Sequence, residues 1–185
     1  MSELSGKRVL IFVGDDYEDM ELQYPKYRLR EAGAEVVIAG LEADRVYHGK
    51  HGYPEKSQCA VDGLNAADFQ GVVIPGGWMP DKLRRSEWVK RLVHEIGAAG
   101  GVIASICHGP WIDISAGVVK GVRYTSTPAI RDDLVNAGAI WEDNVVVVDR
   151  NHVSSRRPDD LPDFCRETVK LLAGAGVETA AAAGR

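Results

Sequence analysis

The sequence predicts an α/β protein whose central sheet is mostly parallel and is covered by helices on both faces. Short apolar runs of strand length alternate along the chain with amphipathic stretches of helical length. Every residue of the run at 9–13 is apolar, which is typical of a strand covered on both faces. The 185 residues suit one domain with a sizeable core, which we expect over residues 1–174. The Ala- and Gly-rich tail at 175–185 has little to bury, and we expect it to be disordered.

Each predicted strand is a short apolar run bounded by turn formers or charged residues. Val153 is expected in a short edge strand near the end of the chain. Residues 42–63 are richer in polar groups and turn formers, so we interpret them as a small hairpin or excursion. The runs that predict buried strands lie at 9–13, 35–39, 72–74, 102–106 and 145–148.

The amphipathic stretches between these runs predict helices. Gly33 stands where a helix C-cap belongs, and Pro110 stands near a first helical turn, where no amide donor is needed. The expected helices cover residues 18–32, 80–85, 86–98, 110–116, 128–137 and 161–172.

The charge balance and the apolar pattern exclude several functional classes. The chain has 22 Lys and Arg against 27 Asp and Glu, a net charge of −5, and nucleic-acid or anionic-membrane binders usually carry a basic surface. No apolar run approaches the roughly 18 residues of a membrane span, and the first run is too short for a signal peptide. We expect a cytoplasmic protein that binds neither nucleic acid nor membranes.

Three cysteines are present, and they cannot all pair within one chain. They are Cys59, Cys107 and Cys165, and none lies in a Cys-x-x-Cys motif. A reduced compartment and at least one free thiol are therefore expected. Cys59 lies in the polar excursion and Cys165 in a predicted helix, so both are interpreted as packing or bystander thiols.

The carboxyl ends of the predicted strands carry the residues that suggest chemistry. In open parallel sheets, ligands bind beyond these ends, near a switch in strand order. This rule selects residues 15–18, 75–78 and 107–108, which are far apart in the sequence. They bring acids, flexible backbone amides and a thiol to one edge of the sheet.

Cys107 lies where a predicted strand turns into a helix within about three residues. Unpaired amides and the helix dipole favour a thiolate there, and we expect a depressed thiol pKa. The alternative is a small buried hydrophobic residue. His108 either shuttles a proton or orients the loop through a hydrogen bond. Adjacent side chains on a strand point to opposite faces, so the pair cooperates only if the backbone turns sharply.

Four acids precede or open the first helix, and an acid facing the thiol would share a proton with it. The residues alone do not select one of the four, and most such runs are solvated loops or N-caps. Gly76 and Gly77 offer backbone donors for an oxyanion hole, or form an ordinary turn. The acids are Asp15, Asp16, Glu18 and Asp19.

Other candidates are weaker. His48 and His51 have a spacing that suits a metal, but with no third ligand evident we interpret them as a solvated loop. His94 is expected in a surface pair and His152 in a structural role. The sequence contains no Gly-x-Gly-x-x-Gly, P-loop or Gly-x-Ser-x-Gly motif, and we expect no cofactor.

Three separated motifs resemble the ThiJ/PfpI superfamily, also called the DJ-one family. They are Tyr17-Glu-Asp-Met-Glu-Leu, Pro75-Gly-Gly and Ala104-Ser-Ile-Cys-His-Gly-Pro, within a match over about residues 7–173. The chain is most similar to the PfpI-type intracellular proteases and stress proteins. The resemblance implies a flavodoxin-like three-layer sandwich close to class I glutamine amidotransferases.

The same resemblance implies roles for individual residues. Cys107 matches the nucleophile, Glu18 the acid that hydrogen-bonds the sulfur, and His108 the histidine of a proposed triad. The third triad member comes from a neighbouring subunit and corresponds to Asp81, where the family often has the longer Glu. A homodimer or higher homo-oligomer is therefore expected.

The substrate pocket implied by the resemblance contains Trp78, Trp111 and Thr127, the last where some relatives carry Tyr. The family's activities imply a Cys107-dependent, cofactor-free enzyme that acts on small carbonyl compounds in a glyoxalase- or deglycase-like reaction. The alternatives are a PfpI-type peptidase or amidase acting on peptides, and a redox-sensing or chaperone-like stress protein.

Overall fold

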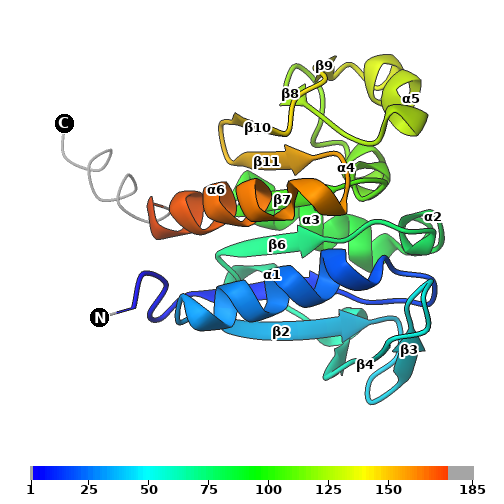
Figure 1. Cartoon of the computed structure of the whole chain (residues 1–185). Coiled ribbons are helices and arrows are strands. Elements are labelled where there is room, and N and C mark those ends of the chain that lie inside the picture. Colours follow the sequence, from blue (N-terminus) through cyan, green and yellow to red (C-terminus); the bar gives the residue numbers. More distant parts are fainter. Residues whose placement is uncertain (1, 175–185) are drawn as a thin grey trace.

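The computed structural model describes residues 2–174, and the tail expected at 175–185 lies outside the described residues. A seven-stranded sheet forms the middle layer, with helices on both faces (Figure 1). The predicted three-layer α/β sandwich of the flavodoxin-like type is confirmed.

The central sheet has the strand order β10-β11-β7-β6-β1-β2-β5. Neighbouring strands are parallel, with the exception of the β10–β11 pair. β6 and β7 are buried along their whole length, as the continuous apolar pattern predicts. The strands are β1 (Arg8–Phe12), β2 (Glu35–Gly40), β5 (Cys59–Ala60), β6 (Gly71–Ile74), β7 (Val102–Ile106), β10 (Val146–Asp149) and β11 (His152–Ser155).

Two helices, α1 (Asp19–Glu31) and α6 (Leu161–Gly174), pack against each other on one face of the sheet (Figure 1). The opposite face carries α2 (Met79–Leu83), α3 (Glu87–Ala98) and α4 (Pro110–Ala116). Gly33 follows α1 with a φ of 95°, so the predicted C-cap is confirmed. Within the described residues, no helix has the length and apolar character needed to cross a bilayer.

The edge of the sheet differs from the prediction for Val153. That residue lies in β11, which is an interior strand between β10 and β7, and β10 forms the edge. The chain turns back at Arg150 with a φ of 54°, so the two strands form an antiparallel hairpin. The Asn151 side chain donates hydrogen bonds to the carbonyl groups of Gly97 and Gly101 and so fixes this hairpin to the sheet.

Two smaller units flank the sheet. The predicted excursion contains a hairpin of β3 (Val46–His48) and β4 (Pro54–Lys56), joined by the loop at 49–53. The second unit comprises β8 (Arg123–Tyr124), η3 (Pro128–Ile130), α5 (Arg131–Asn136) and β9 (Ile140–Trp141), with a small core of its own. The predicted helix over 128–137 is thus divided into η3 and α5, and the two-residue strands were not predicted. The remaining short elements are η1 (Val61–Gly63), η2 (Ala66–Asp68) and η4 (Pro158–Asp160).

Candidate active site

The segments that follow β1, β6 and β7 meet at the carboxyl edge of the sheet, as predicted. Tyr17 and Gly77 form an isolated β-bridge. Glu18 N donates to Gly76 O at 3.2 Å, and Trp78 N donates to Asp16 O at 2.9 Å. These contacts bring the acidic segment and the glycine turn together beside Cys107.

Cys107 occupies a left-handed turn with a φ of 62°. For a residue other than glycine this conformation is strained, and it persists because neighbouring contacts hold it. Its amide donates to Ser155 O at 3.0 Å, and its carbonyl accepts from Thr127 N at 3.2 Å. A Cβ at Gly109 would lie 2.4 Å from Ile74 O, so the turn requires glycine at that position.

The turn brings the adjacent side chains of Cys107 and His108 to the same side. Cys107 Sγ lies 3.3 Å from His108 Nδ1, and the imidazole lies between Trp78 and Trp111, with ring centroids at 5.3 Å and 5.0 Å. Burial and the positive charge of Lys50 lower the pKa of His108. A neutral imidazole can accept the thiol proton, so the geometry supports the proton-transfer interpretation of His108.

Glu21, and not Glu18, is the acid that faces the thiol, so the expectation for Glu18 is wrong in this respect. Glu21 is fully buried and interacts with Cys107, and its Oε2 accepts a hydrogen bond from Gly76 N at 2.7 Å. Glu18 is the N-cap of α1, and its Oε2 accepts from Glu21 N at 2.9 Å. Helix geometry explains the difference, because a residue three positions after the N-cap lies in the first turn. Glu21 lies within the motif Tyr17-Glu-Asp-Met-Glu-Leu, but the resemblance assigned this role to Glu18.

The pKa values of Glu21 and Cys107 are coupled because the two groups share one buried space. Burial, followed by the negative charge of Glu18, raises the pKa of Glu21 to about 8, against the opposing effect of the Gly76 amide. Burial, followed by the negative charge of Glu21, raises the pKa of Cys107 to about 12. The expectation of a depressed thiol pKa is therefore wrong, since burial outweighs the backbone donors.

A proton on Glu21 changes the environment of the sulfur. A neutral carboxyl group no longer repels a thiolate, and its O–H can donate a hydrogen bond to it. The backbone amides of Gly77 and His108 favour the thiolate as well. Below its pKa of about 8 the carboxyl group keeps its proton, so its O–H can act as a third donor for the sulfur.

The two glycines after β6 have different roles. The amide of Gly76 is occupied by Glu21, so this residue is not available as an oxyanion donor, contrary to the expectation. A Cβ at Gly76 would lie 2.7 Å from both Cys107 Cβ and Glu21 Oε2, which explains the need for glycine. Gly77 has a φ of 76°, and its amide interacts with the Cys107 sulfur.

Three further predicted residues lie around the thiol and its histidine. Trp78 is 59% exposed and stands at the start of α2 beside His108. Trp111 Nε1 donates to Asp133 Oδ2 at 2.7 Å, which fixes the indole next to the imidazole. Thr127 is linked through its backbone to Cys107. These residues lie around the site, and their role as a substrate pocket stays a prediction.

Asp81 lies on α2 and faces solvent. In its own chain its carboxylate binds Arg85 at 2.6 Å, and its side chain is 46% exposed. Its contact with the His108 of another subunit stays a prediction.

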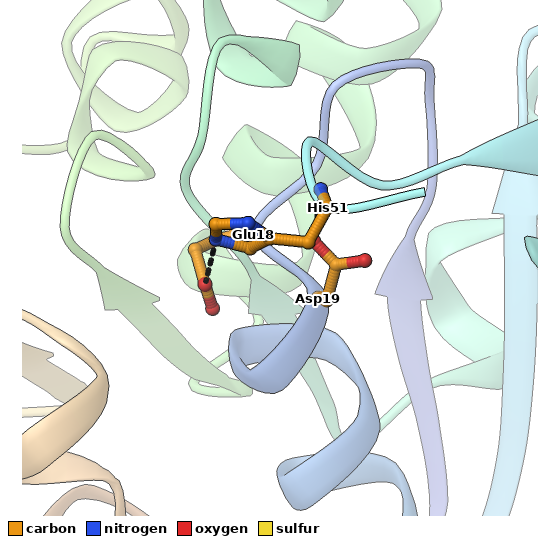
Figure 2. Close-up of side chains that lie close together, drawn as sticks. All are labelled: Glu18, Asp19 and His51. Atoms are coloured by element: carbon orange, nitrogen blue, oxygen red, sulfur yellow. Dashed lines mark hydrogen bonds and ion pairs between the residues drawn. The ribbon is translucent and has the colours of Figure 1, made fainter. Parts of the chain in front are cut away.

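Glu18, Asp19 and His51 form a close group on α1 and the 49–53 loop, with one ligand atom from each lying within 4.8 Å of the others (Figure 2). His51 thus lies beside the carboxylates of Glu18 and Asp19, which its spacing from His48 in the sequence does not indicate. Both oxygens of Asp19 already accept hydrogen bonds, from His51 N and Tyr53 N at 2.9 Å, and Glu18 Oε2 caps α1. The group fits a clamp between loop and helix better than a metal site.

The other two cysteines lack such surroundings. Cys165 is 2% exposed, and burial raises its pKa to about 12. Cys59 is half-buried in β5, and burial raises its pKa as well. All three cysteines, each in the described part of the chain, are free thiols.

Comparison with known proteins identifies the family of this chain. The model of the DJ-1/PfpI family matches residues 7–171. The deglycase PfpI of Pyrococcus furiosus is 47% identical over 165 residues, covering 89% of this chain and 99% of that protein. YraA of Bacillus subtilis, named a candidate cysteine protease, is 40% identical over 166 residues, covering 90% and 98%. The crystal structure of Drosophila melanogaster DJ-1beta superposes with a TM-score of 0.84 at 30% identity, covering 91% of each chain. The chain therefore belongs to the DJ-1/PfpI family.

Proposed function

We propose that the protein is a cysteine-dependent enzyme that acts on small carbonyl compounds in a deglycase- or glyoxalase-like reaction. The contact between Cys107 Sγ and His108 Nδ1 at 3.3 Å, with Glu21 on the sulfur, carries this proposal. This contact supports the proposal because a thiol, an imidazole and a buried carboxyl group lie at one point, where they could act as nucleophile, base and acid. Several relatives named as deglycases support the substrate class.

The proposed reaction begins with attack of the sulfur on an aldehyde carbon. The thiol proton passes to His108, the C–S bond forms, and the carbonyl oxygen takes up a proton to give a hemithioacetal. With a 2-oxoaldehyde, a base then removes the proton from the carbon that bears sulfur, and a proton is added to the neighbouring carbon. The resulting thioester is hydrolysed by water to a 2-hydroxy acid, and the thiol is released.

The surrounding residues suit this chemistry. The amide of Gly77 is a candidate donor to the developing oxyanion, and Trp78, Trp111 and Thr127 are candidates for the substrate pocket. The half-exposed indole of Trp78 supplies apolar area beside the base.

The test is D-lactate formation from methylglyoxal, measured for wild type and for Cys107→Ala. We expect turnover in wild type and none in the variant, while Cys59→Ala serves as the matched control and keeps its rate. Equal rates in wild type and Cys107→Ala, or no turnover in either, would remove the proposal.

A peptidase is the second candidate, because Asp81 is exposed and YraA is named for that activity. In this version a homo-oligomer brings the Asp81 of one subunit to the His108 of another. Peptide cleavage that is lost in Asp81→Asn, with the oligomer intact by light scattering, would support it. Cleavage that persists in Asp81→Asn would contradict the shared triad. The cytoplasmic location and the homo-oligomer remain part of the proposal.

A further inference from the structure

Lys50 lies beside the candidate active site, and the proposed reaction does not use it. Its backbone N–H donates to Tyr17 O at 2.9 Å. The next residues of its loop, His51 and Tyr53, donate their amides to the carboxylate of Asp19. The loop that carries Lys50 is therefore fixed to the start of α1.

The ammonium group of Lys50 lies beside Glu18, close enough to the reacting groups to affect their pKa values. Nζ lies 3.9 Å from Glu18 Oε1, next to the first turn of α1. Its positive charge lowers the pKa of both Glu21 and His108, the two residues that flank the sulfur of Cys107. The side chain is 40% exposed, so a molecule that enters from solvent can reach it.

The ion pair with Glu18 does not occupy this ammonium group. A charged N–H···O hydrogen bond is about 2.7–2.9 Å long, so a separation of 3.9 Å is a loose contact. Glu18 has other partners, since it accepts from Glu21 N and its Oε1 lies 3.8 Å from His51 Nε2. Lys50 can therefore turn toward an incoming anion without leaving the buried carboxylate bare.

We propose that Lys50 selects for 2-oxoaldehyde substrates that also carry a carboxylate. This inference rests on the proposed function and adds a substrate class to it. Glu18 places a negative charge beside the site that would repel an anion, and Lys50 offsets this charge and supplies donors for a carboxylate. The 2-oxoaldehyde 4,5-dioxopentanoate carries such a carboxylate and would be converted to a 2-hydroxy diacid, and methylglyoxal is a neutral 2-oxoaldehyde for comparison.

The first experiment compares two alkylating agents that differ in charge. Iodoacetate and iodoacetamide react with Cys107 in the same way, because the S–C bond forms as the C–I bond breaks and iodide leaves. The rates are followed by mass spectrometry of the Cys107 peptide, which separates them from reaction at Cys59 or Cys165. In Lys50→Met we expect the iodoacetate-to-iodoacetamide ratio to fall about three- to tenfold, the size of one charge pair near a protein surface.

Two variants control for charge and folding. Lys50→Arg keeps the positive charge and should keep the wild-type ratio. Lys170→Met removes one positive charge from α6, where the side chain is 75% exposed, and should not change the ratio. An unchanged ratio in Lys50→Met, or an equal fall in Lys170→Met, would overturn the assignment.

The second experiment measures kcat/KM for 4,5-dioxopentanoate and methylglyoxal in the same variants. Selective loss with 4,5-dioxopentanoate in Lys50→Met supports the inference, and an equal effect on both aldehydes overturns it. If neither aldehyde is turned over by wild type, the proposed function fails, and the alkylation ratio still decides the role of Lys50 in recognising anions.

Discussion

The carboxyl group of Glu21 holds the amide of Gly76 at 2.7 Å and interacts with the thiol of Cys107. Glu21, in the first turn of α1, thereby joins Gly76, in the turn after β6, to Cys107, which follows β7. Its raised pKa follows from burial and from the charge of Glu18. The first two predictions concern this contact.

Replacing Glu21 should separate the function of the carboxyl group as a donor from its function as an acid. Glu21→Ala removes the donor to the sulfur and should lower kcat/KM for the aldehyde about 100-fold, in the range of acid–base groups. Glu21→Gln keeps a neutral N–H donor and should retain more activity. Steady-state kinetics check this, and an Ala variant as active as the Gln variant would contradict it.

Replacing Glu18 should shift the pH dependence without removing the chemistry. Glu21 acts as a donor below its pKa of about 8, so activity should decline above that pH in wild type. Glu18→Gln removes a negative charge that raises this pKa, so the decline should begin at lower pH. The kcat/KM profile against pH measures the shift, and an alkaline limb that stays in place would rule out this coupling.

Gly76 should be sensitive to substitution, because a side chain there would enter the site. In Gly76→Ala the new Cβ meets Cys107 Cβ and Glu21 Oε2 at 2.7 Å, so we expect a loss of about 1–3 kcal/mol in the free energy of unfolding. Activity should fall as well, because both contacts belong to the site. Gly63→Ala is the matched control, with nothing within 4 Å of its new Cβ. Denaturant unfolding of the two variants gives the comparison, and equal stabilities would refute the packing argument.

A buried polar group beneath the nucleophile turn should give two opposing pH effects. Ser105 Oγ donates to Asp113 Oδ2 at 2.5 Å, and Tyr124 OH contacts both this oxygen and His152 Nδ1, the latter at 2.6 Å. Burial raises the pKa of Asp113 from 3.8 to about 7 and lowers that of His152 from 6.5 to about 4. Both groups are therefore uncharged in the folded protein near pH 6.

The signs of these two effects are opposite. The contribution of Asp113 to the free energy of unfolding is most favourable below pH 3.8 and is lost as the pH rises to about 7. The loss is ~4 kcal/mol for a pKa difference of about three units. The contribution of His152 is most favourable above pH 6.5 and is lost as the pH falls to about 4, by ~3 kcal/mol. In wild type the two largely cancel between pH 4 and 6.5.

Single variants should show separately how each group makes the free energy of unfolding depend on pH. Relative to wild type, Asp113→Asn should lose stability as the pH falls from 6.5 to 4, and His152→Gln should lose it as the pH rises from 4 to 7. Denaturant unfolding at a series of pH values measures both, and parallel curves for the three proteins would show that neither group is coupled to folding.

The sheet and its helices could be predicted from the sequence because continuous apolar runs and helical periodicity are local signals. The helix Pro110–Ala116 has the bounds that the pattern gave, and the three site segments meet where parallel-strand geometry requires. The position of Val153 could not be predicted, because an edge strand and an interior strand of four residues share one pattern. Their order depends on which strand pairs with β7.

The turn that carries Cys107 and His108 could be predicted from the sequence, but the acid that lies beside the thiol could not. Cys107 and His108 are marked by a strand-to-helix turn, which the sequence shows directly. Which of Glu18 and Glu21 reaches the thiol depends on where α1 begins. Glu18 is the N-cap, so its carboxylate accepts the amide of Glu21, and the carboxyl group of Glu21 is left to reach the thiol. The raised thiol pKa was missed for a similar reason, since burial is a property of the packed fold.

The hydrogen bond from Cys107 N to Ser155 O also has a consequence for the order of events during synthesis. β11 supplies this carbonyl group, and it begins 45 or more residues after the end of β7. The ribosome therefore makes β11 well after Cys107. A nascent chain that ends before β11 lacks the partner that holds the left-handed turn. Ribosome-bound chains should thus carry an unassembled thiol until the last hairpin has been made.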